Sequence, residues 1–253
     1  MNILLLGYGK MGKTIETIAL DRGHQIAARV DRGDAPGYNH TDLEAIPTDA
    51  VDVAIEFSSP EAAVDNINYC LTRGWPIVCG TTGWLGHRAD IEQLCQEKNG
   101  AFFYASNYSI GVNLFFRLNK TLARFMRNYP SYHVSMTEIH HTEKKDAPSG
   151  TAITLAEGVM ENLPGKHRWV NKEAAGDESL IDSTDAVEIE SLREGVVPGT
   201  HTVRYDSDVD QIEITHTAHS RQGFALGAVV AAEWIIGREG IFGMDDLLGN
   251  DGF

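Results

Sequence analysis

The sequence lacks any apolar run of the length that a membrane-spanning helix requires. No transmembrane segment is therefore expected. The first apolar stretch, Ile3–Leu6, has no basic residue before it and is cut short by Gly7. This pattern favours a buried strand over a secretory signal peptide, so we expect a cytoplasmic protein without a membrane partner.

Cysteine is also scarce. The 253 residues include three, Cys70, Cys79 and Cys95, an odd number without the spacing of a metal motif. We expect them to be reduced thiols, as in proteins of the cytosol.

Basic residues are outnumbered. The chain has 21 Lys and Arg against 36 Asp and Glu, and its formal net charge is −15. A nucleic-acid surface needs a basic excess, so nucleic acid is not an expected partner. An acidic chain binds small anions only where it gathers a few cations in one place, and such a cluster is the feature to look for.

A glycine motif opens the chain, between the apolar run Ile3–Leu6 and a helical pattern over 13–20. This G-x-G-x-x-G motif comprises Gly7, Tyr8, Gly9, Lys10, Met11 and Gly12. In the dinucleotide fingerprint the first glycine permits a tight turn, the second lets the backbone approach a pyrophosphate, and the third allows close packing. Free N–H groups at the helix start then face the phosphates. The alternative is a glycine-rich turn that binds nothing.

The next strand, over 25–30, ends at Asp31, where the fingerprint places an acid for the ribose hydroxyls. Arg32 follows. It is either a solvated side chain or a cation for a 2′-phosphate, so NADH and NADPH both remain possible cofactors.

Alternating strands and helices continue up to about residue 105 and predict a Rossmann-like, doubly wound parallel sheet. The expected strands are 51–57, 76–79 and 101–105, and the expected helices are 61–73 and 86–98. Gly80, Thr81, Thr82 and Gly83 follow one of these strands, at the edge where open α/β sheets bind ligands. A plain turn is the alternative for this segment.

The second half has another character. After a long helical pattern over 112–127, strand-like runs at 134–139, 187–192, 201–205 and 211–217 predict an α+β domain with a mixed or antiparallel sheet. The polar stretch 171–185 is expected to be a loop, and a helix over 224–236 could return to the first domain. We therefore expect a dinucleotide-binding domain over 1–108, completed by 220–253, and a substrate-binding and oligomerisation domain over 109–219.

The segment Glu138–Ala152 holds the cation cluster that an acidic chain needs to bind anions. Two histidines and two lysines lie between the end of a strand and the start of a helix. Ser149 is a plausible N-cap, and the N–H groups of Gly150 and Thr151 would form an anion seat at the helix N-terminus. Such a site suits a small dicarboxylate.

A metal site is the rival interpretation of the histidines, and it is not favoured. His140 and His141 are adjacent on a strand and point to opposite faces, so they cannot easily chelate one ion. His216 and His219 have no cysteine or carboxylate at a familiar ligand spacing. No metal is expected.

The segment 138–152 resembles the signature of the dihydrodipicolinate (4-hydroxy-tetrahydrodipicolinate) reductase family, and the resemblance spans nearly the whole chain. Segments 7–12, 80–83, 105–113 and Ser220-Arg221 match in order. The resemblance implies a homotetrameric reductase of lysine and diaminopimelate biosynthesis that uses NADH, NADPH or both. It gives hydride to a cyclic dicarboxylate and forms tetrahydrodipicolinate.

The resemblance also implies roles for individual residues. His140 would donate the proton, and Lys144 would assist it and bind substrate. His141, Ser149, Gly150, Thr151 and Arg221 would complete the substrate site. The nucleotide would contact the glycine motif, Asp31, Arg32, Gly80, Thr81, Thr82, Ala105, Ser106, Asn107 and Tyr108.

The chain departs from the family pattern in two places. Its glycine loop is one residue shorter than the more usual form, and Thr142 and Glu143 replace residues that are often basic. Two alternatives stay open: another two-domain dehydrogenase of amino-acid metabolism, and a non-catalytic nucleotide sensor. Neither would need the cation cluster.

Overall fold

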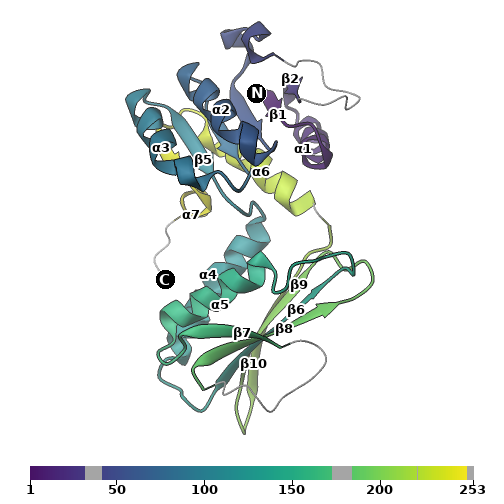
Figure 1. The fold of residues 1–253 in the computed structure, drawn as a ribbon, viewed down its shortest axis with the longest axis vertical. Coiled ribbons are helices and arrows are strands. Elements are labelled where there is room, and N and C mark those ends of the chain that lie inside the picture. The colour runs from purple at the N-terminus through teal and green to yellow at the C-terminus, as the bar shows by residue number, and fades with distance from the viewer. Residues whose placement is uncertain (32–41, 173–183, 221, 250–253) are drawn as a thin grey trace. The chain divides into compact units, whose positions relative to one another are not determined.

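The computed structural model describes residues 1–31, 42–172, 184–220 and 222–249 (Figure 1). Two compact units make up the chain. The first comprises Met1–Ile110 and the segment that begins at Gln222, and the second begins at Gly111. None of the described helices is both long and apolar enough to span a membrane.

The first unit is built on a parallel sheet of six strands, in the order β11-β5-β4-β3-β1-β2. Its strands are β1 (Asn2–Leu6), β2 (Gln25–Val30), β3 (Val53–Glu56), β4 (Ile77–Cys79), β5 (Ala101–Tyr104) and β11 (Gly240–Phe242). Its helices are α1 (Lys10–Asp21), α2 (Pro60–Thr72), α3 (Arg88–Glu97), α6 (Gln222–Ile235) and α7 (Met244–Leu247), with short 3-10 turns at Leu43–Ala45, Thr48–Ala50 and Leu85–His87.

Both faces of this sheet are covered, as its apolar strands require. In β1, Ile3 and Leu5 join the core under α1 and α6, whereas Leu4 and Leu6 join the core under α2 and α3. Alternate side chains of a strand point to opposite faces, so a continuous apolar run needs cover on both sides. The predicted doubly wound fold is confirmed.

The approach of α6 to the sheet depends on one glycine. A Cβ built on Gly227 would lie 1.7 Å from the carbonyl oxygen of Tyr108. The rest of this helix face is also small or aliphatic, with Ala225, Ala228, Val229 and Ala232 fully buried. The backbone of α6 can therefore lie directly against the chain that follows β5.

The second unit has a mixed sheet of five strands in the order β10-β9-β6-β8-β7, which confirms the expected α+β class. The β8 strand pairs in parallel with β6 and β7, and the other pairs are antiparallel. Its strands are β6 (His133–His140), β7 (Arg168–Lys172), β8 (Ala186–Arg193), β9 (Thr200–Asp206) and β10 (Gln211–Thr217), and its helices are α4 (Ile110–Met126) and α5 (Gly150–Asn162).

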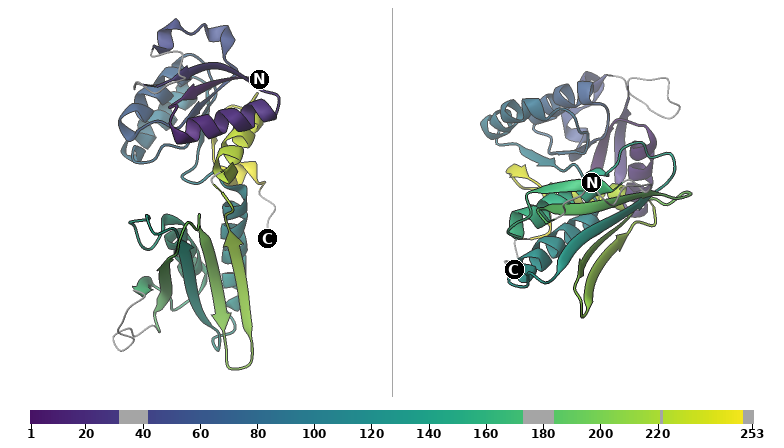
Figure 2. Two further views of the ribbon diagram at one scale, coloured as in Figure 1. Left: turned by 90° about the vertical axis from the view of Figure 1, so that its right-hand side faces the viewer. Right: turned by 60° about the horizontal axis from the view of Figure 1, so that its bottom comes forward.

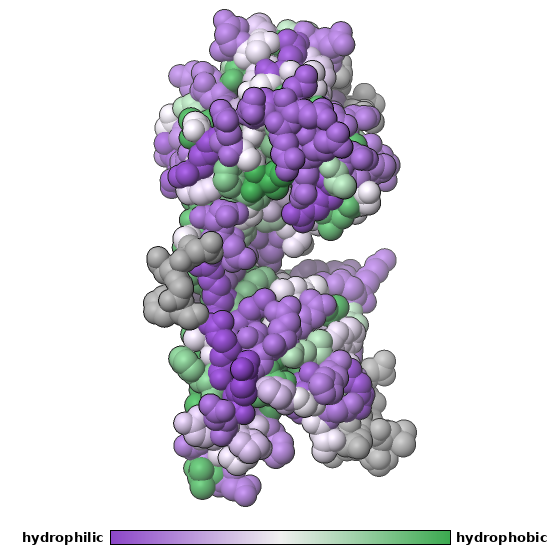
Figure 3. Space-filling model, turned by 90° about the vertical axis from the view of Figure 1, so that its left-hand side faces the viewer, coloured by the Kyte–Doolittle hydropathy of each residue, from purple (hydrophilic) through white to green (hydrophobic). Residues whose placement is uncertain are grey.

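Helices α4 and α5 cover one face of the second sheet (Figures 1 and 2). The side chains of β6 alternate, and those on the helix-covered face are Val134, Met136, Glu138 and His140. Hydrophilic residues cover most of the face of the molecule drawn in Figure 3. On the buried face of β6, by contrast, Glu138 and His140 are ionisable residues beside the apolar Val134 and Met136, so their burial needs an explanation.

Several predicted details were wrong. The expected loop over 171–185 begins too early, because Asn171 and Lys172 belong to β7, a strand that was not expected. The loop's residues 173–183 lie outside the described residues. The short elements β11 and α7 were also missed. These elements are short and half-exposed, and their sequences have no clear periodicity.

We expect Gly227→Ala to lower the free energy of unfolding by at least about 2 kcal/mol, because the new methyl group meets backbone that cannot rotate away. Urea denaturation followed by circular dichroism measures the loss. Gly86→Ala is the matched control, since a Cβ there meets no atom within 4 Å. Equal stability of both variants would contradict the close approach.

Candidate functional site

The glycine loop connects β1 to α1 in the first unit. Gly7 has φ +89°, and a Cβ built on it would lie 2.1 Å from the carbonyl oxygen of Phe57. A Cβ on Gly12 would lie 2.3 Å from the carbonyl oxygen of Gly7. The tight turn and the close packing predicted for these two glycines are thus confirmed. Gly9, the N-cap of α1, has open space beside it, as an approaching phosphate would require.

Asp31 lies beside this loop and accepts a hydrogen bond from the backbone N–H of Tyr8, at 2.7 Å. A cavity of about 570 Å³ opens next to it at the carboxyl ends of β1, β2 and β3. Its lining includes Gly7, Gly9, Asp31, Glu44, Ser58 and Tyr69. Arg32, the predicted partner of a phosphate, lies outside the described residues.

The other predicted nucleotide residues differ in exposure. Lys10, Thr82 and Ser106 are exposed, Met11, Gly80 and Asn107 are half-buried, and Thr81 and Ala105 are buried. The hydroxyl of Tyr8 is hydrogen-bonded to Glu16. The side chain of Tyr108 is 2% exposed, and its hydroxyl donates to the carbonyl of Cys79 at 2.7 Å. The side chain of Tyr108 is thus part of the core, and only its backbone is left to meet a ligand.

Sequence reasoning missed Glu56 at the end of β3. Its carboxylate is fully buried and accepts hydrogen bonds from the N–H and hydroxyl of Ser58. The thiol of Cys79 donates to it at 3.1 Å, and burial together with this carboxylate raises the pKa of that thiol. The sequence did contain a signal for this residue, because Glu56 is the one acid at the end of the otherwise apolar strand β3. Glu56 thereby fixes Ser58, which lines the cavity.

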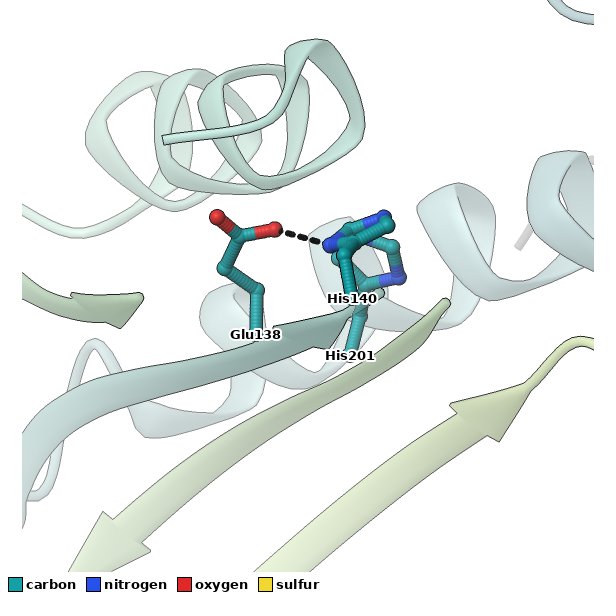
Figure 4. Close-up of side chains that lie close together, drawn as sticks. All are labelled: Glu138, His140 and His201. Carbon is teal, nitrogen blue, oxygen red and sulfur yellow. Dashed lines mark ion pairs between the residues drawn. The ribbon is translucent and has the colours of Figure 1, made fainter. Parts of the chain in front are cut away.

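The second unit gathers Glu138 and His140 of β6 with His201 of β9 (Figure 4). These side chains are 0%, 8% and 5% exposed. Glu138 Oε2 lies 2.5 Å from His140 Nδ1, and the two histidine rings meet edge to face with centroids 5.1 Å apart. Antiparallel pairing places Glu138 directly opposite His201. The sequence predicted only His140 of this group.

Arg193, at the end of β8, holds the same carboxylate from its other side. Its Nη2 lies 3.0 Å from Glu138 Oε1 and donates to the carbonyl of Asp146 at 2.6 Å. Burial alone would raise the pKa of Glu138, but hydrogen bonds from His140, Ser149 and Arg193 lower it to about 2. The buried carboxylate therefore stays ionised. The sequence analysis also missed Arg193, because the sequence alone does not show which residue of a neighbouring strand pairs with His140.

Lys144 lies in the loop after β6, 19% exposed at its side chain, with its ammonium 2.6 Å from Asp146 Oδ2. Its hydrogen bond lowers the pKa of Asp146. Arg193 Nε also donates to the backbone carbonyl of Lys144 at 3.3 Å. The loop therefore presents Lys144 in a fixed backbone position, with its charge balanced by an exposed acid.

The start of α5 adjoins this loop. Ser149 is the N-cap, as predicted, and its Oγ accepts from the N–H of Ala152 at 3.2 Å. Gly150 is exposed with open space beside it, Thr151 is half-exposed, and His141 is half-buried. Arg221 lies outside the described residues. The structure thus brings His140, Lys144 and the exposed N-terminus of α5 together around one loop.

His201 is held neutral. Burial, and next the charge of His140, lower its pKa to about 4. Its Nε2 lies 3.0 Å from Ser149 Oγ, which can donate to it. A neutral ring at this place adds no positive charge beside His140.

A metal ion could in principle be held by Glu138, His140 and His201, since one donor atom from each lies within 4.8 Å of the others. However, Arg193 and the N–H of Ser149 already bond to the carboxylate, and His140 Nδ1 faces its other oxygen. A cation would have to displace a guanidinium and a ring proton. The donor set suits proton transfer better than metal binding, and the absence of a metal stays a prediction.

Comparison with known families decides between the interpretations. The family described as "Dihydrodipicolinate reductase, N-terminus" matches residues 1–108, and "Dihydrodipicolinate reductase, C-terminus" matches 111–248. The chain belongs to the dihydrodipicolinate reductase family. The predicted resemblance is confirmed over nearly the whole chain, and the two alternatives left open by the sequence are set aside.

Relatives of known name agree. The chain is 50% identical over 248 residues to a 4-hydroxy-tetrahydrodipicolinate reductase of Christiangramia forsetii, covering 98% of both chains. It is 36% identical to one of Methanosarcina mazei, covering 98% and 99%. The fold is similar to a dipicolinate-bound dihydrodipicolinate reductase from Paenisporosarcina, with TM-score 0.79 at 20% identity, covering 97% and 99%.

The depressed pKa of His201 predicts a pH-dependent stability. Between pH 6.5 and 4 the unfolded chain binds a proton at this ring and the native chain does not, so stability falls as the pH falls through this window. The loss is at most about 3 kcal/mol. Urea denaturation at pH 7 and pH 4.5 should show a smaller loss for His201→Gln than for the natural chain. His133→Gln, at the exposed start of β6, should keep the full loss.

Proposed function

We propose that this enzyme reduces 4-hydroxy-tetrahydrodipicolinate, or its dehydrated ring, to tetrahydrodipicolinate in the biosynthesis of lysine and diaminopimelate. The observation that carries the proposal is the convergence of the ionised Glu138 with His140 beside it, Lys144 and the N-terminus of α5 around one loop. A cyclic dicarboxylate that accepts hydride needs a proton donor, a cation to stabilise the developing charge, and N–H groups that bind its carboxylates. The expected placement in the cytoplasm and the assembly as a homotetramer belong to the same proposal.

The first unit would hold the nucleotide. The N–H groups at the start of α1 would face its pyrophosphate, and the open side of Gly9 leaves room for that contact. Asp31 would accept from ribose hydroxyls at the edge of the cavity. The loops after β4 and β5, with Gly80, Thr82 and Ser106, would border the nicotinamide end. A bound reduced nicotinamide supplies the hydride.

The second unit would hold the substrate and complete the reaction. Hydride addition pushes electron density to the ring's α carbon, which must collect a proton, and His140 donates it. Lys144 leaves Asp146 to meet a substrate carboxylate and stabilises the developing charge. The N–H groups of Gly150 and Thr151, with Ser149, His141 and Arg221, bind the carboxylates.

The cofactor preference follows from the charges along the cavity. Asp31 and Glu44 both line it, which disfavours a 2′-phosphate, whereas Arg32 can meet one. We therefore expect both nucleotides to bind, NADH more tightly, with affinities within about two orders of magnitude. Calorimetric titration measures both. Glu44→Gln should strengthen binding of NADPH more than of NADH, and binding of neither nucleotide by the natural chain would refute the proposed site.

Replacing the proton donor tests the reaction. His140→Gln should lower kcat by roughly 10²- to 10⁴-fold, the usual effect of a group that transfers a proton, with little change in nucleotide affinity. The assay follows NADH or NADPH oxidation with substrate generated by a coupled synthase. His133→Gln on the same strand is the matched control and should be unaffected. Near-normal turnover of His140→Gln would exclude this residue as the donor.

A further inference from the structure

Glu138 lies in an unusual place for a charged residue. Its side chain is fully buried and shares the helix-covered face of β6 with Val134 and Met136. A carboxylate enclosed among apolar side chains is costly unless hydrogen bonds and opposite charges compensate it. Since the substrate would meet the exposed loop and helix start, a residue buried this deeply acts through its neighbours.

The two oxygens of this carboxylate face different groups, and Figure 4 marks the ion pair between one of them and His140. Oε1 accepts from the backbone N–H of Ser149 at 3.2 Å and from Arg193 Nη2 at 3.0 Å. Oε2 is left to His140, whose Nδ1 lies 2.5 Å away. The first pair of donors fixes the carboxylate, and the carboxylate in turn fixes one ring.

The short contact determines where the ring proton lies. Two unprotonated atoms with lone pairs would repel each other at this distance, so the ion pair favours a proton on Nδ1. The other nitrogen, Nε2, then faces the opposite side of the ring. There Gly199 gives it room, because a Cβ built on that residue would lie 3.0 Å from Nε2.

The surrounding charges favour the same assignment. The titratable and charged groups around the His140 ring, among the described residues, include Glu138, Lys144 and Arg193, with His201 on β9. His201 is neutral and bonded to Ser149, so it neither competes for Glu138 nor adds a positive charge. Within the described part of the chain, Glu138 is the carboxylate that forms an ion pair with the ring.

We propose that Glu138 is the positioning residue of the reaction: it holds His140 with a proton on Nδ1, so that Nε2 is the atom that donates to the substrate. This inference rests on the proposed role of His140. In the step, the Nε2–H bond of the imidazolium breaks, its proton forms the new C–H bond at the α carbon, and the electron pair stays on Nε2. Solvent water later returns a proton to Nε2. Glu138 stays ionised throughout and stabilises the charged ring before transfer.

Glu138→Gln tests the proposal, because it keeps the shape and removes the charge. We expect kcat to fall about 10²-fold with KM changed by less than about twofold, and the alkaline fall of kcat/KM to move to lower pH. Glu138→Asp, which keeps the charge, should recover part of kcat. Glu190→Gln is the matched control, since Glu190 is an exposed acid on the neighbouring strand β8. Turnover and pH profile of Glu138→Gln equal to those of the control would overturn the proposal.

A direct measurement does not depend on how well the variant folds. In the natural chain with ¹⁵N-labelled histidine, NMR of the imidazole nitrogens gives the tautomer of each neutral ring, and loss of one signal set in His140→Gln assigns that residue. In the neutral ring of His140 we expect Nδ1 protonated and Nε2 unprotonated. The opposite tautomer would overturn the proposal.

The two proposals fail in different ways. If His140→Gln retains near-normal turnover, His140 is not the proton donor, and the positioning role of Glu138 is refuted as well. If His140→Gln is impaired while Glu138→Gln matches the control, His140 keeps its role and only the positioning by Glu138 is refuted.

Discussion

One buried negative charge organises the second unit. Alternation along β6 places Glu138 on the core side of the strand, where it must be compensated. Its compensation comes from the end of β8, the start of α5 and the end of β6 itself. The same guanidinium also bonds to the carbonyls of Lys144 and Asp146. The hydrogen bonds and ion pairs that compensate the buried carboxylate therefore hold the three chain segments of the candidate site together.

In the proposed function, the two units would bind anions in an acidic chain by different means. In the first, backbone N–H groups at the start of α1 and the open side of Gly9 would provide the proposed phosphate contact, and the nearby side chains include the acids Asp31 and Glu44. In the second, cationic side chains are gathered and kept partly covered, where salt screens them less than on an open surface. Positive charge is thus concentrated where a dicarboxylate is expected, against a net charge of −15.

Local pattern predicted most elements but few of the contacts between them. The apolar run of β1, the glycine spacing and the capping serine of α5 are each encoded within a few residues, so they could be recognised in the sequence. Glu138, Arg193 and His201 meet because β6 pairs with β8 on one side and β9 on the other, with His140 opposite Arg193 and Glu138 opposite His201. Strand register depends on the packing of the whole sheet, which local pattern does not contain. The polar, half-exposed β7 was missed for the related reason that its side chains show no two-residue alternation.

The return of α6 and β11 to the first sheet has a consequence for synthesis. Ala225, Ala228, Val229 and Ala232 complete the same core as Ile3 and Leu5, yet they follow the entire second unit in the chain. During translation, which proceeds from the N-terminus, the nascent first unit has one sheet face incompletely covered until those residues leave the ribosome. The second unit, which is continuous in sequence, has its strands and helices available earlier. The chain order therefore favours maturation of the second unit before the first unit is closed.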